Sequence, residues 1–324
     1  MSNDLVTSRR GIFGRLYHGE TSFDFFGKRK IGFTISTILI LLTLGSLFTR
    51  GLNLGIDFEG GVAWQVPSSA TMDVKAARSV LEDNGIQTEN AKVQNLTSGT
   101  TTSIRIQVGD QTSEVRAKVQ NELASKAQVD VNDVSVSSVS SSWGRAITEK
   151  AIRALIAFMV LVGIYIAWRF EWRMAIAAIL AMLHDVLISV GIYSIIGFEV
   201  TPATVVAFLT ILGFSLYDTI VVFDRVRENF RVLRKATLIE NINISTTQTL
   251  LRTMATSIST LLAIAALLLF AGDNLFGFSV ALFIGVSAGT YSSVYIANVV
   301  LVWLDLTVDD LIPPVVEEEV DERP

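Results

Sequence analysis

The sequence predicts a polytopic α-helical membrane protein with six transmembrane helices and a small extracytoplasmic α+β domain between helices 1 and 2. Half of its 324 residues are apolar, and only 18% are Asp, Glu, Lys or Arg, whereas a soluble domain carries about 25% charged residues. Six apolar stretches also reach the length of about 20 residues that a helix needs to cross a bilayer.

The apolar stretches divide the chain into five parts. They cover residues 31–48, 152–168, 174–198, 202–223, 254–271 and 276–304. Each is expected to be helical, because a backbone inside lipid must satisfy its own hydrogen bonds. The expected parts are an N-terminal cytoplasmic segment (1–30), helix 1 (31–50), the α+β domain (51–150), helices 2–6 (151–304) and an acidic cytoplasmic tail (305–324).

The apolar pattern of the inserted domain predicts four strands and two helices. Strands are expected at 61–66, 91–96, 103–108 and 131–139, and helices at 73–84 and 115–127, where apolar residues recur every three or four positions. The order strand–helix–strand–strand–helix–strand is typical of a ferredoxin-like domain. Such a fold gives no function by itself.

Basic residues predict that both termini are cytoplasmic. They precede the first span and occupy the links between spans 2 and 3 and between spans 4 and 5, whereas the other two short links contain none. Positively charged flanks remain on the cytoplasmic side of a membrane. The residues are Arg9, Arg10, Arg15, Lys28, Arg29, Lys30, Arg169, Arg173, Arg225, Arg227, Arg231, Arg234 and Lys235.

Composition argues against several kinds of site. The formal charge is 26 − 31 = −5, so the chain lacks the basic surplus of a nucleic-acid-binding protein. It has no cysteine and only two histidines, His18 and His184, which argues against a disulfide framework, an iron–sulfur cluster or a zinc site. We therefore expect no cofactor, and a lipid bilayer rather than a nucleic acid as partner.

An ionisable residue inside a span is the strongest functional signal in this sequence. Asp218 lies about two-thirds along the fourth span, where a charge costs at least about 2.5–3.5 kcal/mol on insertion scales. The charge of such a carboxyl depends on desolvation and on nearby cations, which makes Asp218 a candidate proton carrier. The alternative is a structural Asp that hydrogen-bonds to Ser or Thr of a neighbouring helix.

Arg252 is the expected counter-charge of Asp218. It begins the fifth span on a polar face formed by steps of three and four residues, which also includes Thr249, Thr256, Ser259 and Thr260. A polar face at lipid depth is expected to point into the bundle. The alternative is an arginine at the membrane boundary that reaches the headgroups.

The third span contains His184 and Asp185. Consecutive residues are about 100° apart around a helix, so the two cannot share one narrow face. We expect one to join the polar interior and the other to bond to a neighbouring helix, and both are candidates for proton relay. Two residues alone do not make a metal site.

The sixth span carries small residues at four-residue steps, which predicts close packing against another helix. They are Ala281, Gly285, Gly289, Ser293 and Ala297. A charged cluster at the end of the fourth span is interpreted as an interfacial helix end with local ion pairs. It contains Asp224, Arg225, Arg227 and Glu228.

Four motifs resemble those of the SecF family, the smaller membrane subunits of the SecDF protein-export complex, and the resemblance covers nearly the whole chain. They are GIDFEGG (55–61), HDV (184–186), LTILGFSLYDTIVVFDRVREN (209–229) and GVSAGTYSS (285–293). Their length and order make the resemblance specific. The first contributes Gly55, Asp57, Gly60 and Gly61, whose glycines permit a tight turn with positive φ.

The resemblance implies half of a resistance-nodulation-division type bundle in the cytoplasmic (inner) membrane of a bacterium. Such a chain pairs with SecD, works with the SecYEG translocon on a secretory polypeptide, and uses the proton-motive force in late steps of export. By motif match, the family's intramembrane Asp and essential Arg correspond to Asp218 and Arg252. Leu216 and Tyr217 stand where many relatives have smaller or amide residues. We therefore favour the proton as the coupling ion and keep sodium as the alternative.

Two other functions fit the same spans. One is a small-molecule or lipid exporter half of the same superfamily, which predicts a large apolar cleft in the outer domain. The other is a passive translocon scaffold, in which Asp218 is structural. In each case we expect a transport or assembly subunit rather than an enzyme.

Overall fold

The long apolar stretches form six helices that are long and apolar enough to cross a membrane in the part of the chain that the structure describes. This computed structural model describes residues 24–69, 71–89, 91–98, 101–232, 236–270 and 272–304. The helices are α2 (Arg29–Thr49), α6 (Ser141–Arg169), α7 (Trp172–Ile196), α8 (Pro202–Val232), α9 (Leu238–Phe270) and α10 (Asp273–Tyr295), continued by α11 (Ala297–Trp303). Arg9, Arg10, Arg15, His18, Arg234, Lys235 and the expected tail 305–324 lie outside the described residues.

Three of these helices extend well beyond their apolar stretches. Helix α6 begins at Ser141, before the expected boundary at residue 150, because Ser140 caps it by accepting a hydrogen bond from the Trp143 amide. Helices α8 and α9 extend into the charged link between them. The sixth span, expected as one helix, is interrupted at Ile296 between α10 and α11.

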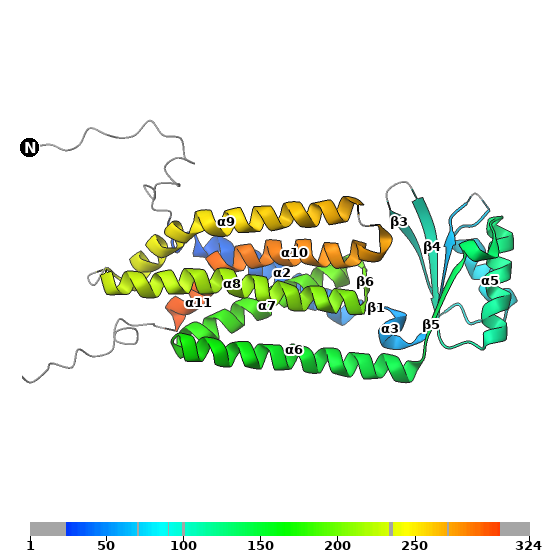
Figure 1. The fold of residues 1–324 in the computed structure, drawn as a ribbon, viewed down its shortest axis with the longest axis horizontal. Coiled ribbons are helices and arrows are strands. Elements are labelled where there is room, and N and C mark those ends of the chain that lie inside the picture. Colours follow the sequence, from blue (N-terminus) through cyan, green and yellow to red (C-terminus); the bar gives the residue numbers. More distant parts are fainter. Residues whose placement is uncertain are drawn as a thin grey trace, which may run out of the picture.

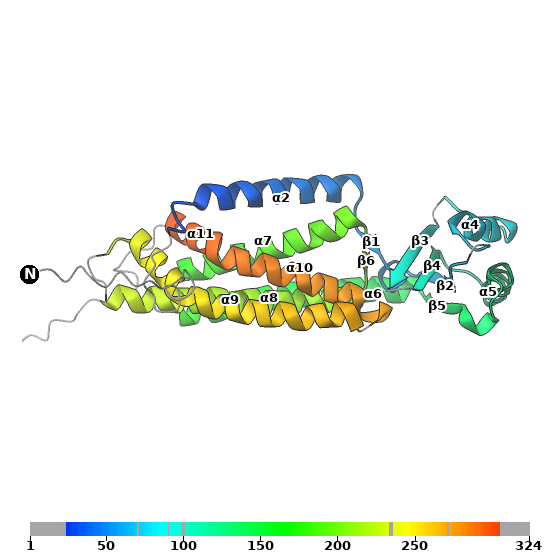
Figure 2. The ribbon, with the colours of Figure 1, turned by 90° about the horizontal axis from the view of Figure 1, so that it is seen from above.

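Helices α7, α8 and α10 form the centre of the bundle, and α6 lies at its edge (Figures 1 and 2). The apolar window of α7 is 56% buried and that of the α10–α11 span 61%, whereas the corresponding window of α6 is only 6% buried. A central helix buries all of its faces, while an outer helix leaves an apolar face for lipid or for another chain. The exposed apolar surface of α6 therefore indicates contact with one of these.

The inserted domain has the ferredoxin-like order that the sequence predicts. Its elements are β2 (Gly61–Pro67), α4 (Val74–Asp83), β3 (Lys92–Ser98), β4 (Thr101–Val108), α5 (Ser113–Ala127) and β5 (Ser135–Val139). The strands pair antiparallel in the order β3-β4-β2-β5. Helices α4 and α5 pack on the side of the sheet away from the bundle, over a core that contains the fully buried Trp64 (Figures 1 and 2).

The expected strand at 131–139 is wrong in its first part. Val131–Asp133 form a short 3₁₀ helix, and the strand begins at Ser135. The Asp130 carboxylate accepts a hydrogen bond from the Asn132 amide, and the Asp133 carboxylate accepts one from the Asp130 amide. These local bonds compete with strand pairing, which explains the slip in the alternation of valines.

Candidate functional site

Asp218 lies inside the bundle on α8 and is 1% exposed. It shares the inward face of α8 with Ser215 and Val222, which are three and four residues away and also buried. Its Oδ2 atom is buried and has no hydrogen-bond partner among the described residues. Buried carboxyl oxygens are nearly always hydrogen-bonded, so this atom is suited to receive something that the side chains around it do not supply.

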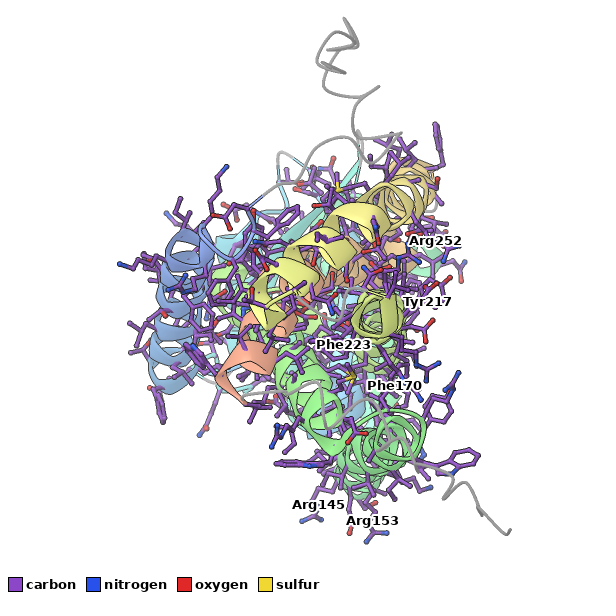
Figure 3. All side chains as sticks on the ribbon, turned by 90° about the vertical axis from the view of Figure 1, so that its left-hand side faces the viewer. Arg145, Arg153, Phe170, Tyr217, Phe223 and Arg252 are labelled. Atoms are coloured by element: carbon purple, nitrogen blue, oxygen red, sulfur yellow. The ribbon has the colours of Figure 1, made fainter. Side chains whose placement is uncertain are left out.

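Arg252 does not occupy the position expected from the sequence. It is exposed on α9, on the same side of the bundle as Tyr217 of α8 in the view of Figure 3, and no ion pair joins it to Asp218 in the described part of the chain. Of the polar face expected to point inwards, only Thr249 is buried, whereas Ser259 is exposed like Arg252 and Thr256 and Thr260 are half-buried. The inward polar face of α9 is instead Asn241, Ser245, Thr249, Thr253 and Ser257.

A polar cavity lies beside Arg252 and close to Asp218. It has a volume of about 380 Å³ and is lined by Val221, Asp224, Arg225, Glu228, Gln248, Thr249 and Arg252, between α8 and α9. Val221 follows Asp218 by three residues and therefore lies about one helical turn further along α8. The cavity, which we call the vestibule, thus brings a polar, open space to within one turn of the buried carboxyl.

The ion pair within the vestibule does not involve Arg252. Arg225 pairs with Glu228 at 2.6 Å and donates through Nε to Gln248 at 2.6 Å. This confirms local ion pairing at the end of α8. Arg252 forms no ion pair with any carboxylate of the described residues, although it lines the vestibule.

His184 and Asp185 hydrogen-bond to each other, an arrangement the sequence did not reveal. Their side chains are 5% and 0% exposed, and His184 Nδ1 lies 3.0 Å from Asp185 Oδ1. His184 Nε2 lies 3.0 Å from Ser36 Oγ on α2. The histidine therefore bonds to a neighbouring helix, as expected for one of the two residues, but it also links that helix to the aspartate.

The carboxylate of Asp185 is satisfied from two further helices. Its Oδ2 atom accepts hydrogen bonds from Ser215 Oγ of α8 at 2.5 Å and from Ser292 Oγ of α10 at 2.7 Å. Asp185 is thus a fully bonded junction of α7, α8 and α10, in contrast to Asp218. Ser36, Ser215 and Ser292 carry no signal in the sequence that separates them from other serines in apolar helices.

The network extends to the start of α2 through Tyr291. Its Oη atom donates to the Gly32 carbonyl at 2.5 Å and lies 3.1 Å from Ser36 Oγ. Polar groups therefore run without interruption from the α2 backbone to the serines of α8 and α10. Hydrogen bonds of this kind fix the relative positions of helices in lipid.

The small residues of α10 face α8 and allow this junction. A Cβ atom on Gly289 would lie 3.0 Å from the Ser215 Cβ, and one on Gly285 would overlap the Ile211 side chain. Ala281 and Ser293 are fully buried along the same helix. The two backbones approach closely because these positions are small, and Ser292 can then reach Asp185.

The GIDFEGG motif forms the connection between the bundle and the α+β domain. Gly60 (φ +80°) and Gly61 (φ +117°) adopt the positive φ expected for them, whereas Gly55 does not (φ −75°). Gly55 is small for another reason, since its Cβ would lie 2.5 Å from Glu199 Oε1 and 3.2 Å from the Val200 carbonyl. Asp57 is half-buried in α3 (Ile56–Glu59).

Leu54, the residue before Gly55, belongs to a short parallel strand pair. β1 (Asn53–Leu54) pairs with β6 (Glu199–Val200), which lies in the connection between α7 and α8. The approach of Gly55 to β6 therefore joins the segment after α2 to this connection. Among the described residues, no group of three or more His, Cys, Asp or Glu is placed to hold a metal ion.

Comparison with known proteins gives consistent matches. The family described as "Protein export membrane protein SecD/SecF, C-terminal" matches residues 118–307, and the "SecD/SecF GG Motif" matches residues 45–63. The protein translocase subunit SecF of Pseudomonas aeruginosa is 45% identical over 304 residues, which cover 94% of this chain and 98% of that protein.

Two solved structures of SecDF share the architecture. The crystal structure of SecDF from Thermus thermophilus, a translocon-associated membrane protein, matches 89% of this chain with a TM-score of 0.82 and 34% identity. A SecDF structure in a "Super-membrane-facing form" matches 88% with a TM-score of 0.63 and 33% identity. This chain spans 39% of the length of each.

Proposed function

This chain belongs to the SecF family of protein translocase subunits, and on that premise we propose that it couples a transmembrane proton gradient to late steps of polypeptide export. It is a multi-pass bacterial membrane protein with a resistance-nodulation-division type helix arrangement. In the proposal, the arginine-rich ends of α6 and α8 and both termini lie in the cytoplasm. The α+β domain then lies on the opposite side, where a secretory polypeptide emerges.

The proposed partners are SecD and the SecYEG translocon. A SecD partner is supported by the match to SecDF, of which this chain spans 39%. The Thermus thermophilus SecDF is a translocon-associated protein, which supports a location beside the channel. The 6% burial of the apolar window of α6 leaves a surface for a partner helix or for lipid.

One observation carries the assignment of the coupling site. The buried Oδ2 of Asp218 has no hydrogen-bond donor among the described residues, although the vestibule begins about one turn away. A charged, unpaired carboxylate inside a membrane is costly. A proton that arrives through the vestibule removes this cost, and its release restores it. By contrast, Oδ2 of Asp185 accepts hydrogen bonds from Ser215 and Ser292.

The proposed cycle moves α8 relative to its neighbours. When Asp218 loses its proton, its negative charge attracts Arg252, which has no ion-pair partner among the described residues. This attraction draws α9 towards α8 through the vestibule. The close packing of α8 against α10 at Ser215 and Gly289 transmits the shift. A proton that crosses 100 mV releases about 2.3 kcal/mol, enough to bias a two-state element about fifty-fold.

Export of a secreted reporter in cells that carry Asp218→Asn tests this function. The matched control is Asp83→Asn, which changes an exposed aspartate of α4. We expect precursor to accumulate with Asp218→Asn at normal abundance of the protein and intact membrane potential, but not with Asp83→Asn. Normal export with Asp218→Asn would make the residue structural and the chain a passive scaffold.

The coupling ion is tested separately from the residue. Collapse of the pH gradient in vesicles at constant potential and without sodium is expected to slow export if the proton is the ion. A requirement for added sodium would overturn that choice. The exporter alternative needs a large apolar cleft, whereas a cavity of about 400 Å³ in the α+β domain is lined by Gly85, Ile86, Gln87, Val108, Gly109 and Gln111.

A further inference from the structure

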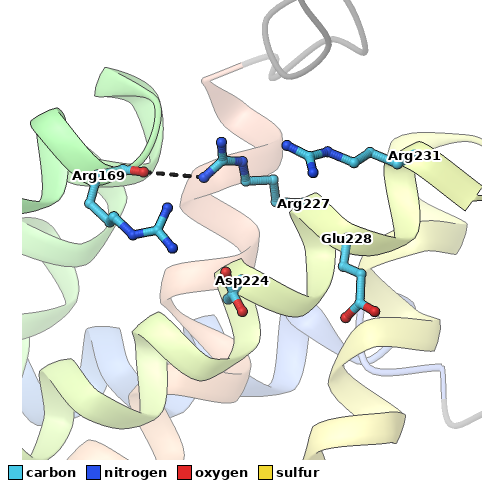
Figure 4. A pocket seen from close by; sticks show the side chains of 5 residues that line it. All are labelled: Arg169, Asp224, Arg227, Glu228 and Arg231. Carbon is cyan, nitrogen blue, oxygen red and sulfur yellow. Dashed lines mark hydrogen bonds between the residues drawn. The ribbon is translucent and has the colours of Figure 1, made fainter.

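A second polar pocket lies at the ends of α6 and α8, and Arg252 of the vestibule does not line it. It has a volume of about 230 Å³ and is lined by Arg169, Asp224, Arg227, Glu228 and Arg231. Figure 4 shows the three guanidinium groups directed towards the same space. Arg169 ends α6, while the other four residues lie on successive turns of α8.

The pocket carries an excess of positive charge. Glu228 is already paired with Arg225 at 2.6 Å. In the described part of the chain, no carboxylate lies within 4.0 Å of the guanidinium groups of Arg169, Arg227 or Arg231. Arg227 instead donates to the Arg169 carbonyl at 3.2 Å, which holds the two arginines together. Three cations then face one uncompensated carboxylate, that of Asp224.

Tryptophans mark the depth of this pocket in the membrane. Trp168 is 84% exposed, Trp172 55% and Trp303 66%, and all three lie at the end of the bundle that carries the arginines. Exposed tryptophans concentrate at the level of lipid headgroups. The pocket therefore lies where phosphate groups of a leaflet are found.

Helix α6, which ends at Arg169, exposes large apolar side chains along its length. Leu161 is 67% exposed and Ile164 63%, on the turns that precede Arg169. These side chains lie five and eight residues before Arg169, about 7–12 Å along the helix axis towards the membrane centre. The cationic pocket and this surface together match the two parts of a phospholipid, which a free anion does not have.

We propose that this pocket binds the phosphate of an anionic phospholipid headgroup, with the acyl chains along the exposed face of α6. Guanidinium groups bind phosphate through two parallel hydrogen bonds, and basic pockets between transmembrane helices bind anionic headgroups. The excess of two positive charges favours anionic over zwitterionic lipids. The proposal is independent of the role of Asp218.

Lipid titration of the full chain in neutral detergent tests this site. Phosphatidylglycerol is added to the purified protein, phosphatidylcholine serves as the zwitterionic comparison, and binding is followed by native mass spectrometry. The test variant is the double change Arg227→Gln and Arg231→Gln. The matched control is Arg145→Gln, an exposed arginine at the far end of α6 (Figure 3).

The expected result is a weaker affinity in the double variant only. Each arginine near the membrane surface contributes about a fivefold gain, so the pair should account for roughly 25-fold. Asp224→Asn should tighten phosphatidylglycerol binding, because it removes the uncompensated carboxylate. If the double variant does not fold, the tighter binding expected of Asp224→Asn tests the proposal instead.

Three results would overturn the proposal. The first is an unchanged affinity in the double variant, or an equal loss in Arg145→Gln. The second is an unchanged affinity in Asp224→Asn. The third is displacement of phosphatidylglycerol by an equal concentration of inorganic phosphate, which would make the pocket a site for free anions.

Discussion

Arg105 of β4 donates a hydrogen bond from Nη2 to Oε1 of Glu199 in β6, at 3.0 Å, and the two side chains form an ion pair. Because β4 belongs to the sheet of the α+β domain and β6 to the connection between α7 and α8, this pair joins the domain to the bundle. The two side chains are 24% and 14% exposed. This direct polar contact can therefore transmit a movement of α8 to the α+β domain.

Glu199→Gln should loosen this joint. The change leaves the partly buried Arg105 without a counter-charge, and a hydrogen bond to a charged group contributes about 1.5–3 kcal/mol. Faster amide hydrogen exchange in β4 is expected, with a similar coupling energy in a double-mutant cycle with Arg105→Gln. Glu149→Gln, in an exposed pair with Arg153 on α6, is the control with little expected effect. Equal exchange in all variants would contradict the joint.

Gly289→Leu should destabilise the bundle by about 1–3 kcal/mol. The added side chain meets Ser215, whose Cβ would lie 3.0 Å from a Cβ at this position, and overpacked sites cost about 1–3 kcal/mol or more. The measurement is the midpoint of thermal unfolding in detergent. Gly213→Ala on α8 is the control, because nothing lies within 4 Å of its Cβ position, and it should stabilise slightly. Equal midpoints would contradict close packing at Gly289.

The sequence predicted the architecture because the signals for it are local and repeated. Apolar length defines each span, and the periods of two and 3.6 residues define the α+β domain. The departures occur where neighbouring residues offer the backbone another partner. Asp130 and Asp133 cap a 3₁₀ turn where valines predicted a strand, and the Ser140 cap extends α6 beyond its apolar stretch.

The candidate site was predicted less well, because it depends on how helices are rotated. Asp218 is buried as its position in an apolar span indicates. The inward face of α9 is set by packing, and it contains Thr253 rather than Arg252. The bond from His184 to Ser36 joins residues 148 positions apart. No periodicity within one helix can report such a contact.

Ser292→Ala should weaken the junction at Asp185. It removes one of two serine donors to a buried carboxylate oxygen, and hydrogen bonds between transmembrane helices contribute about 0.6–1.7 kcal/mol. The thermal midpoint should fall, and a double-mutant cycle with Ser215→Ala should show coupling because both donate to the same atom. Ser287→Ala is the control, since this exposed serine donates only to a carbonyl of its own helix. Strict additivity of Ser292→Ala and Ser215→Ala would contradict a shared junction.

Val221→Cys should react with a water-soluble, membrane-impermeant maleimide, although it lies deep in an apolar sequence. The chain has no cysteine of its own, so each engineered thiol reports only its own position. Val221 lines the polar vestibule, so a thiol at this position is expected to reach water and to react as the thiolate. Val222, the next residue, is 1% exposed and packs in the core of the bundle. Val222→Cys is therefore the matched control.

The side from which Val221→Cys is labelled also tests the proposed orientation. The vestibule opens beside Arg225 and Arg252, at the end of the bundle assigned to the cytoplasm. Labelling is expected in inverted vesicles and not in right-side-out vesicles. The reverse would place the arginine-rich end outside, against the positive-inside rule. Equal, slow labelling of Val221→Cys and Val222→Cys in both vesicle types would mean that the vestibule is dry, and a proton would then need another route to Asp218.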